Sequence, residues 1–223
     1  RSLKGKFMQP KLIIFDWDGT LADTTNPIIA TFRQSFADCG LPVPEADRIR
    51  PLIGYSLPAI VRNLMPDADD HVQAAVVETY ASHYLNPNNH NMKLFDSAVP
   101  CLNTLKGQGY LLAVATGKGR TGLDRAIGQT GTAHFWAATT CASEQPSKPA
   151  PEMVFALCDA LGLMPSETLV VGDTTYDLQM AANAKASAVA VATGAHTKAQ
   201  LAAEPCLAVL DGLAELPALL AAL

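Results

Sequence analysis

Short apolar runs alternate with helical patterns along most of this chain. This alternation predicts parallel strands joined by helices, the βαβ arrangement of an α/β fold. The first and fourth runs are apolar throughout, which is typical of strands covered on both faces. The predicted strands are Leu12–Phe15, Leu111–Ala115, Ala137–Cys141, Leu169–Val171, Ala188–Ala192 and Leu207–Leu210, and Met153–Leu161 is a predicted helix that ends at Gly162.

One long segment departs from the alternation. From about Thr24 to Tyr84 there is no convincing strand, and the helical patterns Pro27–Asp38 and His71–Leu85 are separated by several prolines. The polar, turn-rich residues 86–91 follow and are typical of a linker. The sequence therefore predicts a Rossmann-like parallel sheet core with an inserted α-helical cap domain. The core comprises residues 8–23 and 95–223, and the cap residues 24–94.

The composition is that of a globular chain, with 49% apolar and 17% charged residues and a formal net charge of -5. Without a basic run, nucleic acid is not expected as a partner. No apolar stretch is long enough to span a bilayer, so we expect a cytoplasmic protein without a membrane partner. The five cysteines are scattered and predict reduced thiols rather than a metal site. Met8 resembles a natural start, so residues 1–7 are expected to be foreign to the natural chain.

Two carboxylates follow the first predicted strand, in Asp16-Trp17-Asp18-Gly19. Ligands of open α/β sheets bind beyond the carboxyl ends of the strands, so these carboxylates are well placed for chemistry. An Asp-Gly turn alone would be a structural feature. A calcium loop is excluded, because Gly19 is at loop position four rather than six and Pro27 occupies position twelve.

Other candidate groups follow later strands. Thr116-Gly117-Lys118 offers a hydroxyl and backbone N–H groups that can hold phosphoryl oxygens. Lys148 is a single cation in a proline-rich stretch. Asp173 lies at the end of the fourth strand and Asp177 one helical turn later on the same side. Magnesium prefers such oxygen ligands. Each group alone is weak evidence for a functional site, but the order of acidic pair, hydroxyl, lysine and acidic pair along the chain is a specific signal.

In this order the motifs resemble those of the haloacid-dehalogenase-like superfamily. The resemblance runs from Leu12 to about Thr193. Its phosphoglycolate phosphatase and pyrophosphatase branch matches Phe15-Asp16-x-Asp18-Gly19-Thr20-Leu21-x-Asp23, Ala115-Thr116-Gly117-Lys118, Lys148-Pro149-x-Pro151 and Gly172-Asp173-x-x-x-Asp177. The resemblance implies a Rossmann-like core with a helical cap inserted after the first motif, and Mg²⁺-dependent hydrolysis of a small phosphate ester.

The resemblance also implies a role for each motif residue. Asp16 attacks phosphorus and becomes an aspartyl phosphate. Asp18 protonates the leaving oxygen and then accepts a proton from water. Thr116, Gly117 and Lys148 bind the phosphoryl group, Lys148 as part of the catalytic set. The Asp16 and Asp173 carboxylates and the Asp18 backbone carbonyl hold Mg²⁺, and Asp177 orients metal-bound water.

Alternative functions remain open from the sequence. A phosphomutase of the same fold is the main enzymatic alternative, although Thr20 stands where β-phosphoglucomutases usually have valine. A dinucleotide-binding oxidoreductase is suggested by the GxGxxG pattern at residues 117–122, which leaves the four aspartates unexplained. A catalytically silent ligand-binding protein is the third alternative. Asp18 argues against a dehalogenase or a phosphonatase.

The cap is expected to close over the site and select the substrate. Its segment Ile53-Gly54-Tyr55-Ser56 is either an inter-helix loop or a loop that enters the core, with Gly54 allowing close backbone approach. Tyr55 belongs to the same candidate specificity set. Arg62 is a candidate contact for a substrate carboxylate. The sequence does not distinguish phosphoglycolate, a sugar phosphate, a nucleotide or pyrophosphate, nor a monomer from a homodimer.

Overall fold

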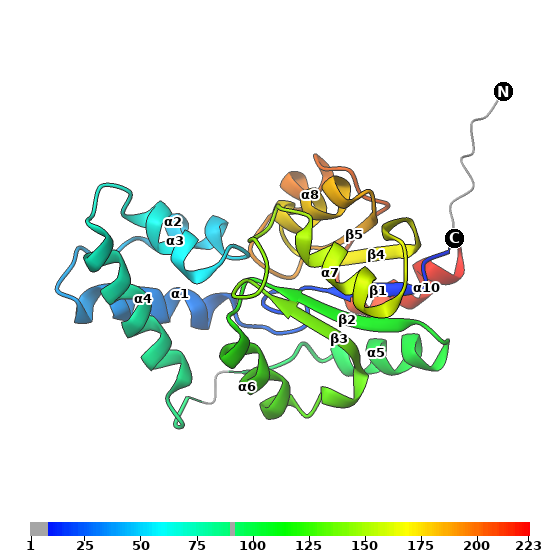
Figure 1. Cartoon of the computed structure of the whole chain (residues 1–223), viewed down its shortest axis with the longest axis horizontal. Helices are drawn as coiled ribbons and strands as arrows, with labels where there is room; N and C mark the ends of the chain where they lie inside the picture. The colour runs from blue at the N-terminus through cyan, green and yellow to red at the C-terminus, as the bar shows by residue number, and fades with distance from the viewer. Residues whose placement is uncertain (1–8, 90–91) are drawn as a thin grey trace.

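The computed structural model describes residues 9–89 and 92–223. The expectation for residues 1–7, and the last two residues of the predicted linker, His90 and Asn91, lie outside the described residues. Within the described part, six parallel strands form one sheet in the order β3-β2-β1-β4-β5-β6. This is the strand order of a Rossmann-like sheet. Figure 1 shows helices on both faces of the sheet and a separate group of helices beyond the carboxyl ends of its strands.

All six predicted strands are present, with ends that differ by one or two residues. β1 lies between β2 and β4, whose carboxyl ends carry the Thr116 and Asp173 motifs. The sheet thus brings distant segments of the sequence together. The strands are β1 (Leu12–Phe15), β2 (Leu111–Thr116), β3 (Trp136–Cys141), β4 (Thr168–Gly172), β5 (Ser187–Val191) and β6 (Val209–Leu210).

Side chains of the central strand alternate between two apolar clusters, as the period of a β-strand requires. Ile13 and Phe15 pack in one cluster, with residues of α5, α6 and α10. Leu12 and Ile14 pack in the other, with residues of α7, α8 and α9. These helices are α5 (Ala98–Gly107), α6 (Arg120–Thr130), α7 (Glu152–Leu161), α8 (Thr175–Ala184), α9 (Lys198–Ala202) and α10 (Leu216–Ala221), with 3₁₀ turns at Ala133–Phe135, Pro165–Glu167 and Leu213–Glu215.

The segment without predicted strands forms helices that pack mainly on one another. They are α1 (Thr25–Asp38), α2 (Ala46–Ile49), α3 (Leu57–Leu64) and α4 (Asp70–Leu85), with a 3₁₀ turn at Arg50–Leu52. Phe32, Val61 and Val76 are buried in their shared apolar cluster, which is separate from the two clusters of the sheet. We propose on this basis that α1–α4 form the predicted cap, called the cap below; the remainder is called the core.

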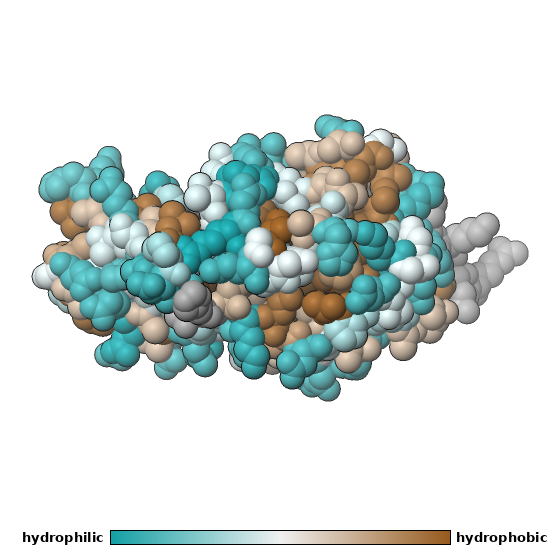
Figure 2. Space-filling model, turned by 90° about the horizontal axis from the view of Figure 1, so that it is seen from below, coloured by the Kyte–Doolittle hydropathy of each residue, from teal (hydrophilic) through white to brown (hydrophobic). Residues whose placement is uncertain are grey.

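The two chain crossings between cap and core lie side by side. The Asp23 N–H donates to the Lys93 carbonyl at 2.8 Å, and the Phe95 N–H donates to the Leu21 carbonyl at 2.9 Å. In Figure 1 the strands point toward the cap, so the carboxyl ends of β1, β2 and β4 face it. Apolar residues form separate patches among hydrophilic ones in the view of Figure 2. No helix of the described residues is long and apolar enough to cross a membrane.

Candidate functional site

Asp16 lies directly after the central strand and is almost completely buried. Its backbone N–H continues the sheet by donating to the Val171 carbonyl at 3.0 Å. This bond fixes the start of the loop, and one side-chain oxygen lies 2.9 Å from the Lys148 ammonium. Burial raises the pKa of Asp16 to about 7, against the opposing effect of Lys148. A carboxylate held at a strand end beside a cation has the position required of a nucleophile.

Asp173 follows β4 and is fully buried beside the turn that carries Gly19. Its two carboxylate oxygens accept hydrogen bonds from the Thr20 hydroxyl at 2.9 Å and the Ala195 N–H at 2.8 Å. A Cβ at Gly19 would lie 2.3 Å from one of these oxygens, so only glycine permits this approach. Burial, and next the charge of Asp16, raise the pKa of Asp173 well above its ordinary value.

Lys148 links the first and last acidic motifs. Besides Asp16, its ammonium donates to Asp177 at 2.6 Å, and all three side chains are almost fully buried. The second Asp177 oxygen accepts from the Thr174 N–H at 3.1 Å and its hydroxyl at 2.7 Å, which begins α8 as a capping box. Burial favours the neutral amine, but the two carboxylates outweigh it and raise the pKa of Lys148. Lys148 is therefore charged at neutral pH.

The described residues contain a group of acidic side chains close enough to share a metal ion. One oxygen from each of Asp16, Asp173 and Asp177 lies within 4.8 Å of the other two. Such an all-oxygen donor set suits Mg²⁺. Each of the three has protein partners as well: Lys148 for Asp16 and Asp177, and Thr20 and Ala195 for Asp173. Burial is the main cause of the raised pKa of both Asp16 and Asp173, and neighbouring carboxylates add to it; a divalent cation would favour the ionised form of both.

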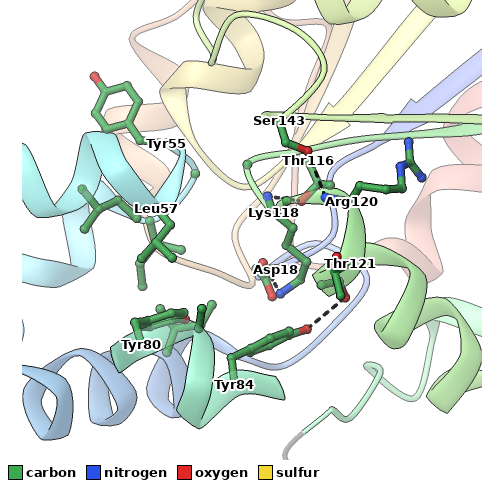
Figure 3. Close-up of a pocket in the computed structure, with 18 of the residues that line it drawn as sticks. Asp18, Tyr55, Leu57, Tyr80, Tyr84, Thr116, Lys118, Arg120, Thr121 and Ser143 are labelled. Carbon is green, nitrogen blue, oxygen red and sulfur yellow. Dashed lines mark hydrogen bonds and ion pairs between the residues drawn. The ribbon is translucent and has the colours of Figure 1, made fainter. Parts of the chain in front are cut away.

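Asp18 lines the wall of a cavity between the core and the cap (Figure 3). The Thr24 hydroxyl donates to one of its oxygens at 2.7 Å, and the Lys118 ammonium lies 3.0 Å from the other. Lys118 also lies 4.4 Å from the centre of the Tyr84 ring. Lys118 and Tyr84 were not among the predicted site residues. The Thr-Gly-Lys sequence carried the signal for Lys118, whereas Tyr84 resembles any helical core residue.

The predicted phosphate-binding turn lies against the loop of the cap. Thr116 ends β2 fully buried, and its hydroxyl oxygen accepts from the Lys118 N–H at 3.2 Å. A Cβ built on Gly117 would lie 2.5 Å from the Tyr55 carbonyl oxygen and 2.8 Å from that of Gly54. The turn and the cap loop are thus in backbone contact. Asp16, Asp18, Thr116 and Gly117 all line the cavity, whereas Lys148 contacts Asp16 but is not itself a lining residue.

The candidate specificity residues of the cap occupy different places. Gly54 has φ +117°, a conformation that favours glycine, and lies against Thr174 and Tyr176 of the core. The Tyr55 ring stacks on the Tyr176 ring with centroids 4.0 Å apart, and both Gly54 and Tyr55 line the cavity. Arg62 is exposed on α3 and is not among the lining residues, so the structure does not bring it to the site.

Comparisons with known proteins agree with this geometry. A family profile described as haloacid dehalogenase-like hydrolase matches residues 13–191. A protein of Dickeya dadantii named "Probable phosphatase IndB" is 37% identical over 89% of this chain and 88% of its own length. The phosphoglycolate phosphatase of Haemophilus influenzae is 28% identical over 81% of this chain and 84% of its own.

The fold is also similar to that of a solved protein. A crystal structure from Haemophilus somnus, described as a predicted phosphoglycolate phosphatase, superposes with a TM-score of 0.84 and 23% sequence identity. The match covers 95% of this chain and 98% of the other. At this identity the likeness shows the fold alone.

Proposed function

This chain belongs to the haloacid dehalogenase-like hydrolase family, and from that premise we propose that it is a Mg²⁺-dependent phosphatase of small phosphate esters. The observation that carries the proposal is the position of Asp16. Its carboxylate lies at the end of β1, beside Lys148 and Asp173, and lines the cavity together with Asp18. Two of the relatives that share this architecture are named phosphatases.

Asp16 is the proposed nucleophile. A carboxylate oxygen attacks phosphorus in line, the bond to the ester oxygen breaks, and an aspartyl phosphate forms. The buried Lys148 ammonium contacts the Asp16 carboxylate. It is therefore proposed to orient the attacking carboxylate and to balance charge on the transferring group. Thr116 and the Gly117 N–H lie at the end of the neighbouring strand and are proposed to bind the phosphoryl oxygens.

Asp18 is the proposed general acid and base. It lines the same cavity as Asp16, and Thr24 and Lys118 hold its carboxyl group in place there. In the first step it gives a proton to the ester oxygen. In the second step it accepts a proton from the water that hydrolyses the aspartyl phosphate. The protonation state of Asp18 is thereby restored after each turnover.

Asp16 and Asp173 are proposed to hold Mg²⁺, with the backbone carbonyl of Asp18. When bound, the ion supplies positive charge for the phosphoryl group and for the two carboxylates. Asp177 is proposed to act through its neighbours, because it holds Lys148 and the start of α8. A cytoplasmic location and the absence of a nucleic-acid partner stay predictions.

Phosphate release from para-nitrophenyl phosphate and a metabolite panel tests the proposal. The panel contains 2-phosphoglycolate, sugar phosphates, nucleotides and pyrophosphate, each with Mg²⁺ or EDTA. We expect Mg²⁺-dependent turnover that falls about 10³-fold or more in Asp16→Asn. A fully active Asp16→Asn would contradict the assignment of the nucleophile. A wild type inactive on every substrate would contradict the phosphatase proposal and direct attention to mutase activity or silent ligand binding.

A further inference from the structure

The cavity beneath the cap has a polar end and an apolar end. It encloses about 400 Å³, which is within the range of pockets that bind metabolites of substantial size. Asp16, Asp18 and Thr116 lie at the core end, where the phosphoryl group is proposed to react. The cap contributes apolar and aromatic side chains to the remaining wall, from α1, α3 and α4: Ile28, Phe32, Leu57, Ile60, Tyr80 and Leu85.

The basic side chains of the described cavity lining are both paired with carboxylates of the protein. Lys118 is 3.0 Å from Asp18 and is enclosed by the Tyr84 ring. Arg120 binds Glu144 at 2.7 Å and Asp124 at 3.2 Å. A leaving group with its own carboxylate would lose water on entering this cavity and would have to compete with Asp18 for Lys118, or with Glu144 and Asp124 for Arg120. Burial of an uncompensated charge is costly, so the lining disfavours an acidic leaving group.

The wall of the cap includes aromatic rings in ordered contact. The Tyr80 and Tyr84 rings are nearly parallel, 7° apart in orientation with centroids separated by 6.5 Å. Phe32 lies against Tyr80 with centroids 4.4 Å apart. Such rings offer flat apolar surface, and a ring of a ligand gains from offset or edge contacts with them. Water left against this surface by a short leaving group would be unfavourable.

The geometry points to a phosphate ester whose leaving group is an uncharged, largely apolar ring. The inference rests on the proposed phosphatase function and specifies its substrate class. The phosphoryl group lies at Asp16 and the ring fills the space between α1, α3 and α4. The glycolate part of phosphoglycolate is negatively charged and offers almost no apolar surface to these helices. An aromatic or similar ring satisfies the size, the shape and the charge of the lining.

Three phosphate esters with alcohol leaving groups separate ring binding from leaving-group reactivity. They are benzyl phosphate, ethyl phosphate and 2-phosphoglycolate, each assayed with Mg²⁺ for kcat/KM. We expect benzyl phosphate to exceed both others by at least tenfold, mainly through a lower KM. Equal or higher kcat/KM for 2-phosphoglycolate would overturn the inference while leaving the phosphatase proposal intact. Turnover of none of the three, and of no other panel substrate, would overturn both.

Variants of one cap residue test whether the apolar wall is responsible. Leu57 lines the cavity from the first turn of α3. Leu57→Lys adds a cation there, and we expect the preference for benzyl phosphate over 2-phosphoglycolate to fall at least threefold. Leu57→Ala is the milder second variant, expected to raise the KM for benzyl phosphate but not for ethyl phosphate. Asn63→Ala, exposed on the same helix, is the matched control and should keep the wild-type ratio. Unchanged ratios in both folded Leu57 variants would overturn the inference.

Discussion

The contact between Gly117 and the cap loop makes closure of the cap sensitive to a single methyl group. A Cβ on Gly117 would lie 2.5 Å from the Tyr55 carbonyl oxygen, about 0.9 Å short of an ordinary contact at 3.4 Å. The obstructing atoms belong to backbone, so a side-chain rotation cannot relieve the clash. Gly117→Ala keeps the N–H that is proposed to bind phosphate. Its effect therefore reports on the distance between cap and core.

The magnitude follows from the cost of that displacement. Inserting a methyl group into a close-packed contact costs roughly 1–3 kcal/mol. Because the cap has its own apolar cluster, it can move as a unit, and most of this cost falls on closure rather than on folding. A closure penalty of about 1–3 kcal/mol lowers kcat/KM roughly 5- to 150-fold. We expect the free energy of unfolding to change by less than about 1 kcal/mol, because a cap that moves as a unit keeps its own apolar cluster.

Steady-state kinetics and urea unfolding of the two variants test this reasoning. Gly119→Ala is the matched control in the same turn, because its Cβ would lie 4.0 Å from the nearest atom, the Ser143 hydroxyl. It should retain kcat/KM within a few-fold of wild type. A folded Gly117→Ala with wild-type kcat/KM would refute the link between this contact and turnover. An equal loss in Gly119→Ala would show that any added methyl in the turn is harmful.

The remaining predictions concern the buried charges and the helices. Lys148→Met leaves the carboxylates of Asp16 and Asp177 without their cation, and should lower the free energy of unfolding by about 3–5 kcal/mol in urea titrations; an unchanged midpoint would contradict this. Mg²⁺ should raise the melting temperature of wild type but not of Asp173→Asn in thermal-shift measurements, since binding only to the folded state stabilises it; equal shifts would place the ion elsewhere. Gly128→Ala in α6 has open space for the methyl group. It should raise the free energy of unfolding by about 0.5–1 kcal/mol in urea titrations and leave activity unchanged; a lower free energy of unfolding would contradict this.

The sheet and its reactive edge could be predicted from the sequence because each depends on local patterns. The apolar run Leu12–Phe15 specifies a strand buried on both faces, and parallel strands end at a common edge. The order of motifs then places Asp16, Thr116 and Asp173 together without knowledge of their coordinates. Strand ends moved by one or two residues, because hydrogen bonding to neighbours rather than side-chain polarity decides where a strand stops, as at Thr116 and Gly172.

The sequence could not show which basic residues reach the cavity. Arg62 and Lys118 are both single basic residues in the sequence, yet only Lys118 reaches Asp18. The difference arises from docking: Lys118 lies in the turn that the cap covers, whereas Arg62 is on the outer side of α3. Arg62, the candidate contact for a substrate carboxylate, is thus outside the cavity, and the two basic residues that line it, Lys118 and Arg120, already have carboxylate partners. The proposed preference for an apolar leaving group follows from these positions, since rings and aliphatic chains of the cap line the space left to it.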